Sequence, residues 1–198
     1  NAIHKTLLQK KLNHFSVDNV FVGPGTKQLM FLLQLAFDGD IILPAPSWVS
    51  YEPQSVISNN KVHWIQTKIE NNWHVTSEEI TEVLKQSIAQ NKIIILNTPN
   101  NPSGTNAKNL RELAEIFKKN NIIVLSDEIY SDLNFSENYE SIAKYYPEKT
   151  IISNGLSKWC GAGGWRLGFF AIPDSLKELN NKMQVLASEA YSSPSAPI

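Results

Sequence analysis

Short apolar runs recur along this chain, and longer amphipathic stretches separate most of them. Runs rich in β-branched and aromatic residues, too short to be helices, are typical of strands that are buried on both faces. Apolar residues spaced three and four apart predict amphipathic helices between them. The predicted strands are 20–22, 41–43, 62–66, 93–97, 122–125, 150–152 and 167–172, and the predicted helices are about 27–37, 78–90, 107–119 and 174–190.

This alternation of strands and helices predicts the α/β class, with a mostly parallel seven-stranded sheet and helices on both faces. No repeat, low-complexity tract or linker divides the chain, so we expect one domain over residues 1–198. Residues 1–12 have a helical pattern without a start signal before them, and 192–198 form a Ser/Pro-rich end. We therefore expect the chain to be the middle of a longer protein.

Charge and cysteine content narrow the function. Lys and Arg number 18 and Asp and Glu 19, so the net charge of −1 provides no basic field for nucleic acid or anionic lipid. No apolar run is long enough to span a bilayer, and no signal peptide opens the chain. Cys160 is the single cysteine, which excludes an intramolecular disulfide and a cysteine-rich zinc site. We expect a cytoplasmic protein and predict no metal site.

The loops that follow the predicted strands are the candidate ligand-binding segments. In α/β sheets, ligands bind beyond the carboxyl ends of the strands. Five such segments carry chemically distinctive residues: GPGTK (23–27), PAPSWVSY (44–51), NTPNNPSG (97–104), SDEIY (126–130) and NGLSKWCGAGGWRLG (154–168).

The GPGTK segment places a glycine turn between a strand and a helix start. Backbone N–H groups at a helix start, with the Thr26 hydroxyl beside them, suit a phosphate. The alternative is that GPGTK is an ordinary strand-to-helix turn that binds no ligand. The segment does not match the P-loop, because Lys27 follows Thr, and it does not match the dinucleotide fingerprint, because Gln28 stands where the third glycine would be.

The next three segments present a flat ring, amides and an acid. Trp48 could stack on a heterocycle, or it could simply belong to the core. NTPNNPSG rigidly presents Asn100 or Asn101, although its dipeptides also favour a plain turn. Asp127 and Tyr130 follow the end of the most strand-like run, residues 122–125. A carboxylate at the end of a buried strand needs a cationic partner to remain ionised. A strand-end aspartate also commonly caps a helix.

Five of the nine glycines surround Lys158 and Arg166 in residues 154–168. An amine enclosed by Gly, Ala and Trp would be a nucleophile and a base, and an arginine fork binds phosphate in bidentate fashion. The alternative is a flexible surface loop with two solvated cations. One phosphate site, one stacking ring, one acid and one amine together meet the needs of a phosphorylated pyridine aldehyde.

In this order, GPGTK, SWVSY, NNPSG, SDEIY and SK-x7-R resemble the signature blocks of class I/II aminotransferases, which are pyridoxal-phosphate enzymes of fold type I. The resemblance extends over about residues 20–172. It implies a transaminase that moves an amino group between an amino acid and a 2-oxo acid through lysine-bound pyridoxal phosphate. It also implies a homodimer, in which this chain is the large cofactor-binding domain without the N-terminal segment and the C-terminal small domain.

The resemblance assigns roles to individual residues. Lys158 would form a Schiff base with the cofactor and later move a proton between the substrate and the cofactor. Asp127 would pair with the pyridine nitrogen, and Tyr130 and Asn101 would hydrogen-bond the ring's phenolic oxygen. Trp48 would stack on the ring.

The phosphate shell implied by the resemblance is Gly25, Thr26, Lys27 and Arg166. Many members of the family also have Ser three residues before the lysine, where this chain has Gly155. The nearby Ser157 could partly substitute for that donor.

Other functions share some of these features. Carbon–sulfur lyases and the cyclopropane-forming synthase have the same fold and blocks. A cofactor-binding regulatory module fused to a DNA-binding segment is a second alternative, and a nucleotide-binding α/β domain is a more distant one. These residues do not identify the substrate amino acid, although the sequence around Trp48 most resembles the aspartate/aromatic branch of the family.

Overall fold

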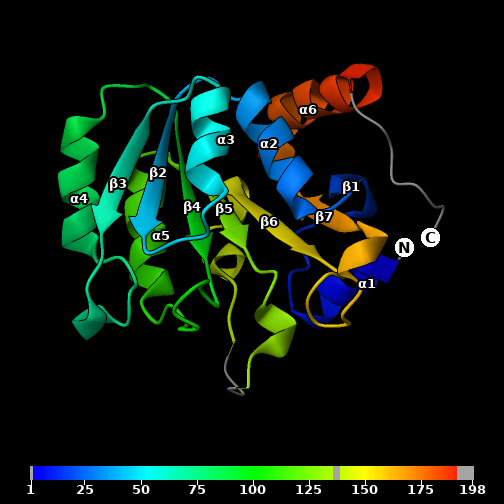
Figure 1. Ribbon diagram of the computed structural model, residues 1–198, viewed down its shortest axis with the longest axis horizontal. Coiled ribbons are helices and arrows are strands. Elements are labelled where there is room, and N and C mark those ends of the chain that lie inside the picture. Colours follow the sequence, from blue (N-terminus) through cyan, green and yellow to red (C-terminus); the bar gives the residue numbers. More distant parts are fainter. Residues whose placement is uncertain (1, 136–138, 191–198) are drawn as a thin grey trace.

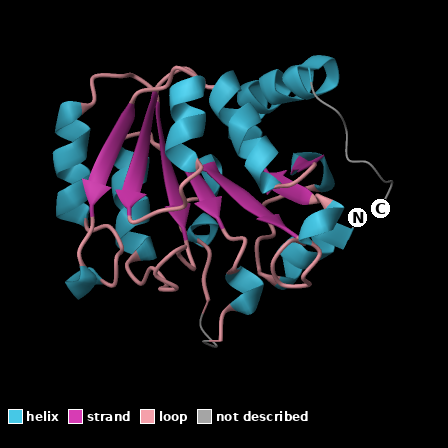
Figure 2. Ribbon diagram, in the orientation of Figure 1, coloured by secondary structure: helices cyan, strands magenta, loops and turns pink. Residues whose placement is uncertain are grey.

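The computed structural model describes residues 2–135 and 139–190, which fold around a seven-stranded sheet (Figures 1 and 2). The Ser/Pro-rich end predicted as a loop lies outside these residues. The strands are β1 (Val20–Gly23), β2 (Asp40–Ala45), β3 (Val62–Gln66), β4 (Lys92–Asn97), β5 (Ile123–Asp127), β6 (Thr150–Gly155) and β7 (Gly168–Ala171). The α-helices are α1 (Ala2–Gln9), α2 (Thr26–Ala36), α3 (Tyr51–Ile57), α4 (Ser77–Gln86), α5 (Leu110–Lys119) and α6 (Lys177–Ala190).

The sheet is mixed, with strand order β1-β7-β6-β5-β4-β2-β3. The α/β class and the seven strands are confirmed, and β2 to β6 pair in parallel. The pairs β6–β7 and β1–β7 are antiparallel. A parallel neighbour needs a crossover connection, usually a helix, whereas β6 and β7 are joined by residues 156–167, which contain no α-helix.

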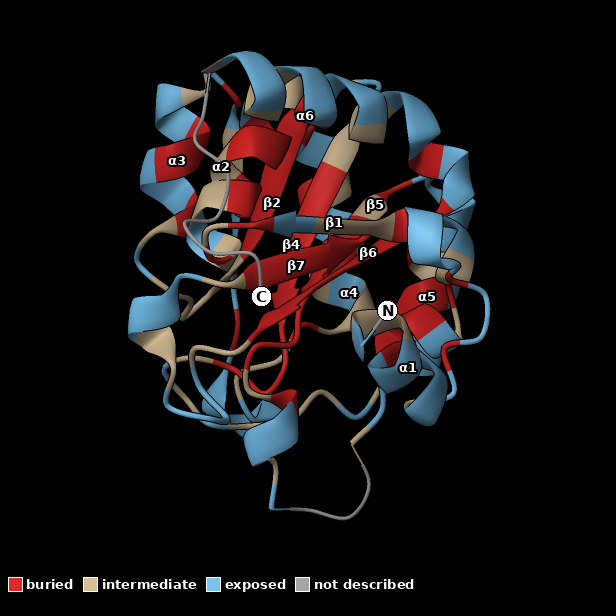
Figure 3. Ribbon diagram, turned by 90° about the vertical axis from the view of Figure 1, so that its right-hand side faces the viewer, coloured by how far each residue is buried: buried red, intermediate tan, exposed pale blue. Residues whose placement is uncertain are grey.

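Strand alternation divides the core between the two faces of the sheet. Ile41, Ile93 and Leu125 point toward α2, α3 and α6, whereas Ile42 and Ile94 point toward α4 and α5. The α1 helix covers the second face near the antiparallel edge. Figure 3 shows the buried strands between exposed outer helix surfaces. The continuous apolar strand runs are therefore explained by helices on both faces.

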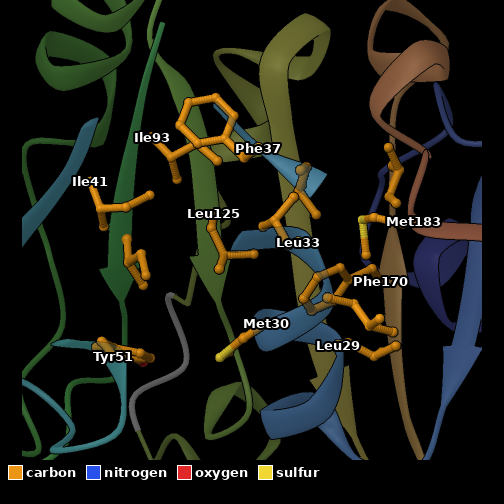
Figure 4. Close-up of a cluster of buried hydrophobic side chains, with 14 of the residues drawn as sticks. Leu29, Met30, Leu33, Phe37, Ile41, Tyr51, Ile93, Leu125, Phe170 and Met183 are labelled. Carbon is orange, nitrogen blue, oxygen red and sulfur yellow. The ribbon is translucent and has the colours of Figure 1, made fainter. Parts of the chain in front are cut away.

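The hydrophobic cluster on the α2 face contains Leu33, Phe170 and Met183, which bring together α2, β7 and α6 (Figure 4). These side chains are essentially removed from water. The buried side of α2 therefore anchors the helix rigidly against the sheet. Its first turn begins the candidate site described below.

The α3 helix is an element that the sequence pattern did not predict. It has seven residues, and its third is Pro53, which a first helical turn tolerates because its N–H would have no partner there. The prolines and aromatic residues of this segment instead suggested a loop. In addition, α4 ends at Gln86 and α5 begins at Leu110, so both are shorter than predicted. None of the described helices is long and apolar enough to cross a membrane.

Gly168 permits a close approach of β7 to the start of α2. A Cβ atom at this position would lie 2.4 Å from the Thr26 nitrogen and 2.7 Å from the Gly25 carbonyl carbon. A Cβ at Gly155, its partner across the β6–β7 pair, would lie 2.6 Å from the Leu167 oxygen. These two glycines thus allow contact between backbone segments.

We expect Gly168→Ala to lower the free energy of unfolding by about 1–3 kcal/mol, because the added methyl group meets backbone that cannot rotate away. Chemical denaturation of the variant and the wild type measures this difference. Gly164→Ala is the matched control, since a Cβ there meets nothing within 4 Å and should change stability little. Equal losses in the two variants would contradict the close-approach explanation.

Candidate functional site

The ends of the central strands bring an amide and an acid together. Asn97 ends β4 and Asp127 ends β5, and the two residues are direct partners in the parallel ladder. Each lies two positions beyond an inward residue of the α2 face, Ile95 and Leu125 respectively, so both side chains point to that face. The strand register therefore places the candidate acid on the side covered by α2 and α3.

A cavity of about 240 Å³ lies at this edge of the sheet. Nine of the ten predicted site residues line it, contributed by the starts of α2 and α3 and by the segments after β4, β5 and β6. The lining residues are Thr26, Lys27, Trp48, Tyr51, Asn97, Asn101, Asp127, Ile129, Tyr130, Ser157, Lys158, Gly163 and Arg166. The tenth predicted residue, Gly25, is not among the lining residues.

One end of the cavity is suited to an anion. The first turn of α2 begins at Thr26, and the N–H groups of a first turn have no partner within the helix. Gly25 precedes it with φ of 94°, and a Cβ at this glycine would lie 2.3 Å from Arg166 Nη2. The guanidinium therefore fits against a backbone that only glycine leaves open. It donates to the Gly163 carbonyl oxygen at 2.6 Å.

Lys27 adds a second cation beside the aromatic wall. Its Nζ lies 5.5 Å from the centroid of the Trp48 ring, within the range of a cation–π contact. Trp48 is half-buried and exposes part of its ring to the cavity. A flat face and positive charge are thus adjacent.

The end of the cavity that carries Asp127 is shielded from water. Asp127 is buried, and burial raises the pKa of its carboxyl from 3.8 to about 6, although hydrogen bonds from Tyr51 and the Ile129 backbone oppose the increase. Tyr51 Oη donates to Asp127 Oδ2 at 2.6 Å, and Ile129 N donates to Oδ1 at 3.3 Å. Burial and the adjacent carboxylate together raise the pKa of Tyr51 well above its ordinary value. The tyrosine therefore keeps its proton and acts as a donor.

Asn97 connects two of the predicted residues. Its Nδ2 donates to the Asp127 carbonyl oxygen at 2.9 Å, and its Oδ1 accepts from Asn101 N at 2.6 Å. Asn100 instead accepts from Ser103 within its own turn. Of the two asparagines that the sequence left open, Asn101 lines the cavity.

Four lining residues, Tyr51, Asn97, Ile129 and Gly163, were not among the predicted site residues, and the side chains of Tyr51 and Asn97 contact Asp127. Tyr51 follows Trp48 by three positions, a spacing that shares one side of a helical turn, but the helix itself was not predicted. Asn97 is the last residue of a buried strand, as is Asp127, and strand parity alone would have indicated that both face the same side.

Lys158 differs from the sequence expectation, because it is exposed in this chain and not enclosed. Its Nζ lies 5.6 Å from the Tyr130 ring centroid at the cavity wall. The flanking Trp159 and Trp165 expose 50% and 64% of their surface, so they do not cover the amine. The loop instead presents the lysine to an open side of the cavity.

Comparisons with known proteins identify the family of this chain. The sequence model of the family "Aminotransferase class I and II" matches residues 1–198. An aspartate aminotransferase of Bacillus sp. (strain YM-2) is 33% identical over 190 residues, which are 91% of this chain and 47% of that protein. The aspartate aminotransferase of Geobacillus stearothermophilus is 35% identical over 187 residues, 89% of this chain and 46% of that protein.

Solved structures have the same fold. The aspartate aminotransferase from Rhizobium meliloti superimposes with a TM-score of 0.88 at 27% identity, covering 98% of this chain and 49% of that one. The enzyme from Thermus thermophilus with maleate gives 0.82 at 27% identity, covering 98% and 50%. This chain belongs to the class I and II aminotransferase family. It spans about half the length of the relatives it matches.

The buried carboxyl makes stability depend on pH. Because the pKa of Asp127 rises from 3.8 to about 6 on folding, the folded state binds a proton that the unfolded chain releases in this window. Ionisation of Asp127 therefore destabilises the folded protein increasingly as pH rises through this window, and the loss of unfolding free energy is complete above about pH 6. A shift of about two units corresponds to about 3 kcal/mol.

We expect Asp127→Asn to gain about 3 kcal/mol of unfolding free energy relative to wild type between about pH 3.5 and 7. Denaturation at several pH values measures this change. Asp38→Asn, the same substitution at an exposed position, is the matched control. Parallel curves for Asp127→Asn and wild type would contradict the assigned pKa.

Proposed function

We propose that this chain provides the cofactor-binding part of a transaminase that uses pyridoxal phosphate to move an amino group between an amino acid and a 2-oxo acid. The observation that carries the proposal is the arrangement of one cavity. An amine, a buried acid, a flat ring and an anion-binding helix start line it together. The family membership and the names of the relatives support transamination over the lyase and regulatory alternatives.

The residues present fit this cofactor at both ends. The pocket left by Gly25 accommodates the Arg166 guanidinium beside the start of α2, which suits a dianionic phosphate. Thr26, Lys27 and Ser157 would add donors there. At the other end, a buried carboxyl suits a pyridinium nitrogen, because the ion pair would be shielded from water.

The middle of the cavity would hold the ring. Trp48 would stack on its face, and Tyr130 and Asn101 would donate to its phenolic oxygen. When bound, the cofactor supplies an aldehyde that condenses with amines and a protonated ring that accepts electrons from the substrate Cα. Lys158 would bond that aldehyde and, once displaced by the substrate amine, hold and return the proton of the substrate Cα. Asp127 would keep the ring nitrogen protonated.

The substrates and assembly are part of the same proposal. Relatives with 33% and 35% identity are named aspartate aminotransferases, so aspartate is the first amino donor to test. A homodimer is the assembly we propose, as the family resemblance implies, and the cytoplasm is the location we propose from the composition of the chain.

Reductive labelling tests the role of Lys158. Borohydride treatment of the protein with pyridoxal phosphate, followed by peptide mapping, should place the pyridoxyl group on Lys158, because its amine faces the cavity. Lys158→Met should lose this label, and Lys144→Met, which changes an exposed lysine elsewhere, should retain it. A label that maps instead to Lys27 would overturn the assignment.

Arg166→Lys should weaken the affinity for pyridoxal phosphate by about tenfold or more, because a point charge replaces a planar fork. Spectroscopic titration of the cofactor measures the dissociation constant. Arg111→Lys is the matched control. Arg111 belongs to α5, where its guanidinium lies over the Tyr145 ring and does not line the cavity. Equal constants for Arg166→Lys and wild type would mean that Arg166 is a structural cation of its loop.

A further inference from the structure

The turn that leads into α3 joins the aromatic wall of the cavity to its acid. Tyr51 N donates to the Trp48 carbonyl oxygen at 3.2 Å, so the two residues lie on one turn. Their rings meet edge to face, with centroids 5.5 Å apart and an interplanar angle of 86°. Beyond this contact the Tyr51 hydroxyl reaches Asp127. A movement of this turn would therefore displace the stacking face and the hydrogen bond together.

The hydrogen bond has the geometry of a charge-assisted contact. Its 2.6 Å oxygen–oxygen distance is in the range of an O–H donor to a carboxylate, and both side chains are buried. The second oxygen of Asp127 receives the longer bond from the Ile129 backbone. Within residues 2–135 and 139–190, none of the ion pairs involves this carboxylate. The tyrosine is thus the strongest donor that the fold supplies to it.

We propose that Tyr51 is a positioning residue, which holds the Asp127 carboxylate in one orientation at the cavity wall and favours its anionic form, so that it can pair with a pyridinium nitrogen. The part of the inference that concerns the cofactor rests on the proposed function. The part that concerns the carboxylate stands on the contact alone. Removal of the hydroxyl should leave the acid protonated at a higher pH.

Four other ionisable groups act on the same carboxylate or on its tyrosine partner. Glu128 follows it in the chain and opposes its ionisation, and Lys158 favours it from the loop after β6. Tyr130 and Tyr139 lie near enough to interact with this pair electrostatically. A single substitution at Tyr51 leaves all four in place, so its effect can be separated from theirs.

The test is a titration of the Asp127 side-chain carboxyl by ¹³C NMR, in wild type and in Tyr51→Phe, without cofactor. Phe retains the ring that contacts Trp48 and removes only the donor. We expect the pKa to increase from about 6 by about one unit, a tenfold change in the ionisation ratio. An unchanged pKa would overturn the proposal.

Cofactor binding gives a second measurement with a pH signature. Since a protonated Asp127 cannot pair with a pyridinium, and an increase of about one unit from a pKa of about 6 lowers the ionised fraction about threefold near pH 6.5, Tyr51→Phe should bind pyridoxal phosphate about threefold more weakly there and nearly as wild type near pH 8.5. A loss of equal size at both values would indicate a packing effect and would contradict the role in ionisation. If wild type binds no pyridoxal phosphate, the proposed function fails, but the NMR titration still decides the role of Tyr51.

Two further samples make the experiment decisive. Tyr146→Phe removes the hydroxyl of another buried tyrosine, on the opposite face of the sheet, and should leave both measurements at wild-type values. If Tyr51→Phe does not fold, wild type can be prepared with 3-fluorotyrosine, whose hydroxyl is a stronger donor. The pKa of Asp127 should then fall, and a constant value would again overturn the proposal.

Discussion

The arrangement of this site depends on a carboxylate held in a dry place at the end of a central strand. Taking a charge out of water is costly, and the pKa of about 6 for Asp127 shows that the fold compensates only part of that cost. The compensation comes from Tyr51 on α3, while Asn97 fixes the backbone of the acid from the neighbouring strand. Each of these contacts requires that β4, β5 and the start of α3 be packed in register, so the core and the site form together.

The opposite end of the cavity follows a different principle. There the charges are cationic and exposed, and they are placed by backbone geometry and not by burial. Gly25 leaves room for Arg166, and Gly168 lets β7 approach the first turn of α2. The cavity therefore has one rigid, desolvated end and one wet end. A ligand with a ring nitrogen and a phosphate fits this polarity.

Much of this could be predicted from the sequence, because the informative features are local. Runs such as residues 93–97 indicate buried strands, and each predicted strand overlaps an observed one. The residues in GPGTK, SDEIY and SK-x7-R lie at or just after the ends of strands, and the α/β alternation predicts where those ends are. Tyr51 was missed because its helix is short and contains a proline, and Asn97 because its role depends on strand register. The exposure of Lys158 agrees with the surface-loop alternative, which the sequence could not separate from an enclosed amine because the outcome depends on how two tryptophans of the same loop pack.

The loop between β6 and β7 has a consequence for how such sites can diversify. It is closed at its base by a hydrogen bond from Leu156 N to the Leu167 oxygen, and both flanking strands are anchored in the sheet. Lys158 and Arg166 lie on this one closed segment. An insertion or deletion inside it would alter the span between amine and guanidinium while leaving the sheet intact. The length of this segment can therefore change independently of the sheet, and a longer or shorter segment would adapt the site to a ligand with a different distance between its aldehyde and its phosphate.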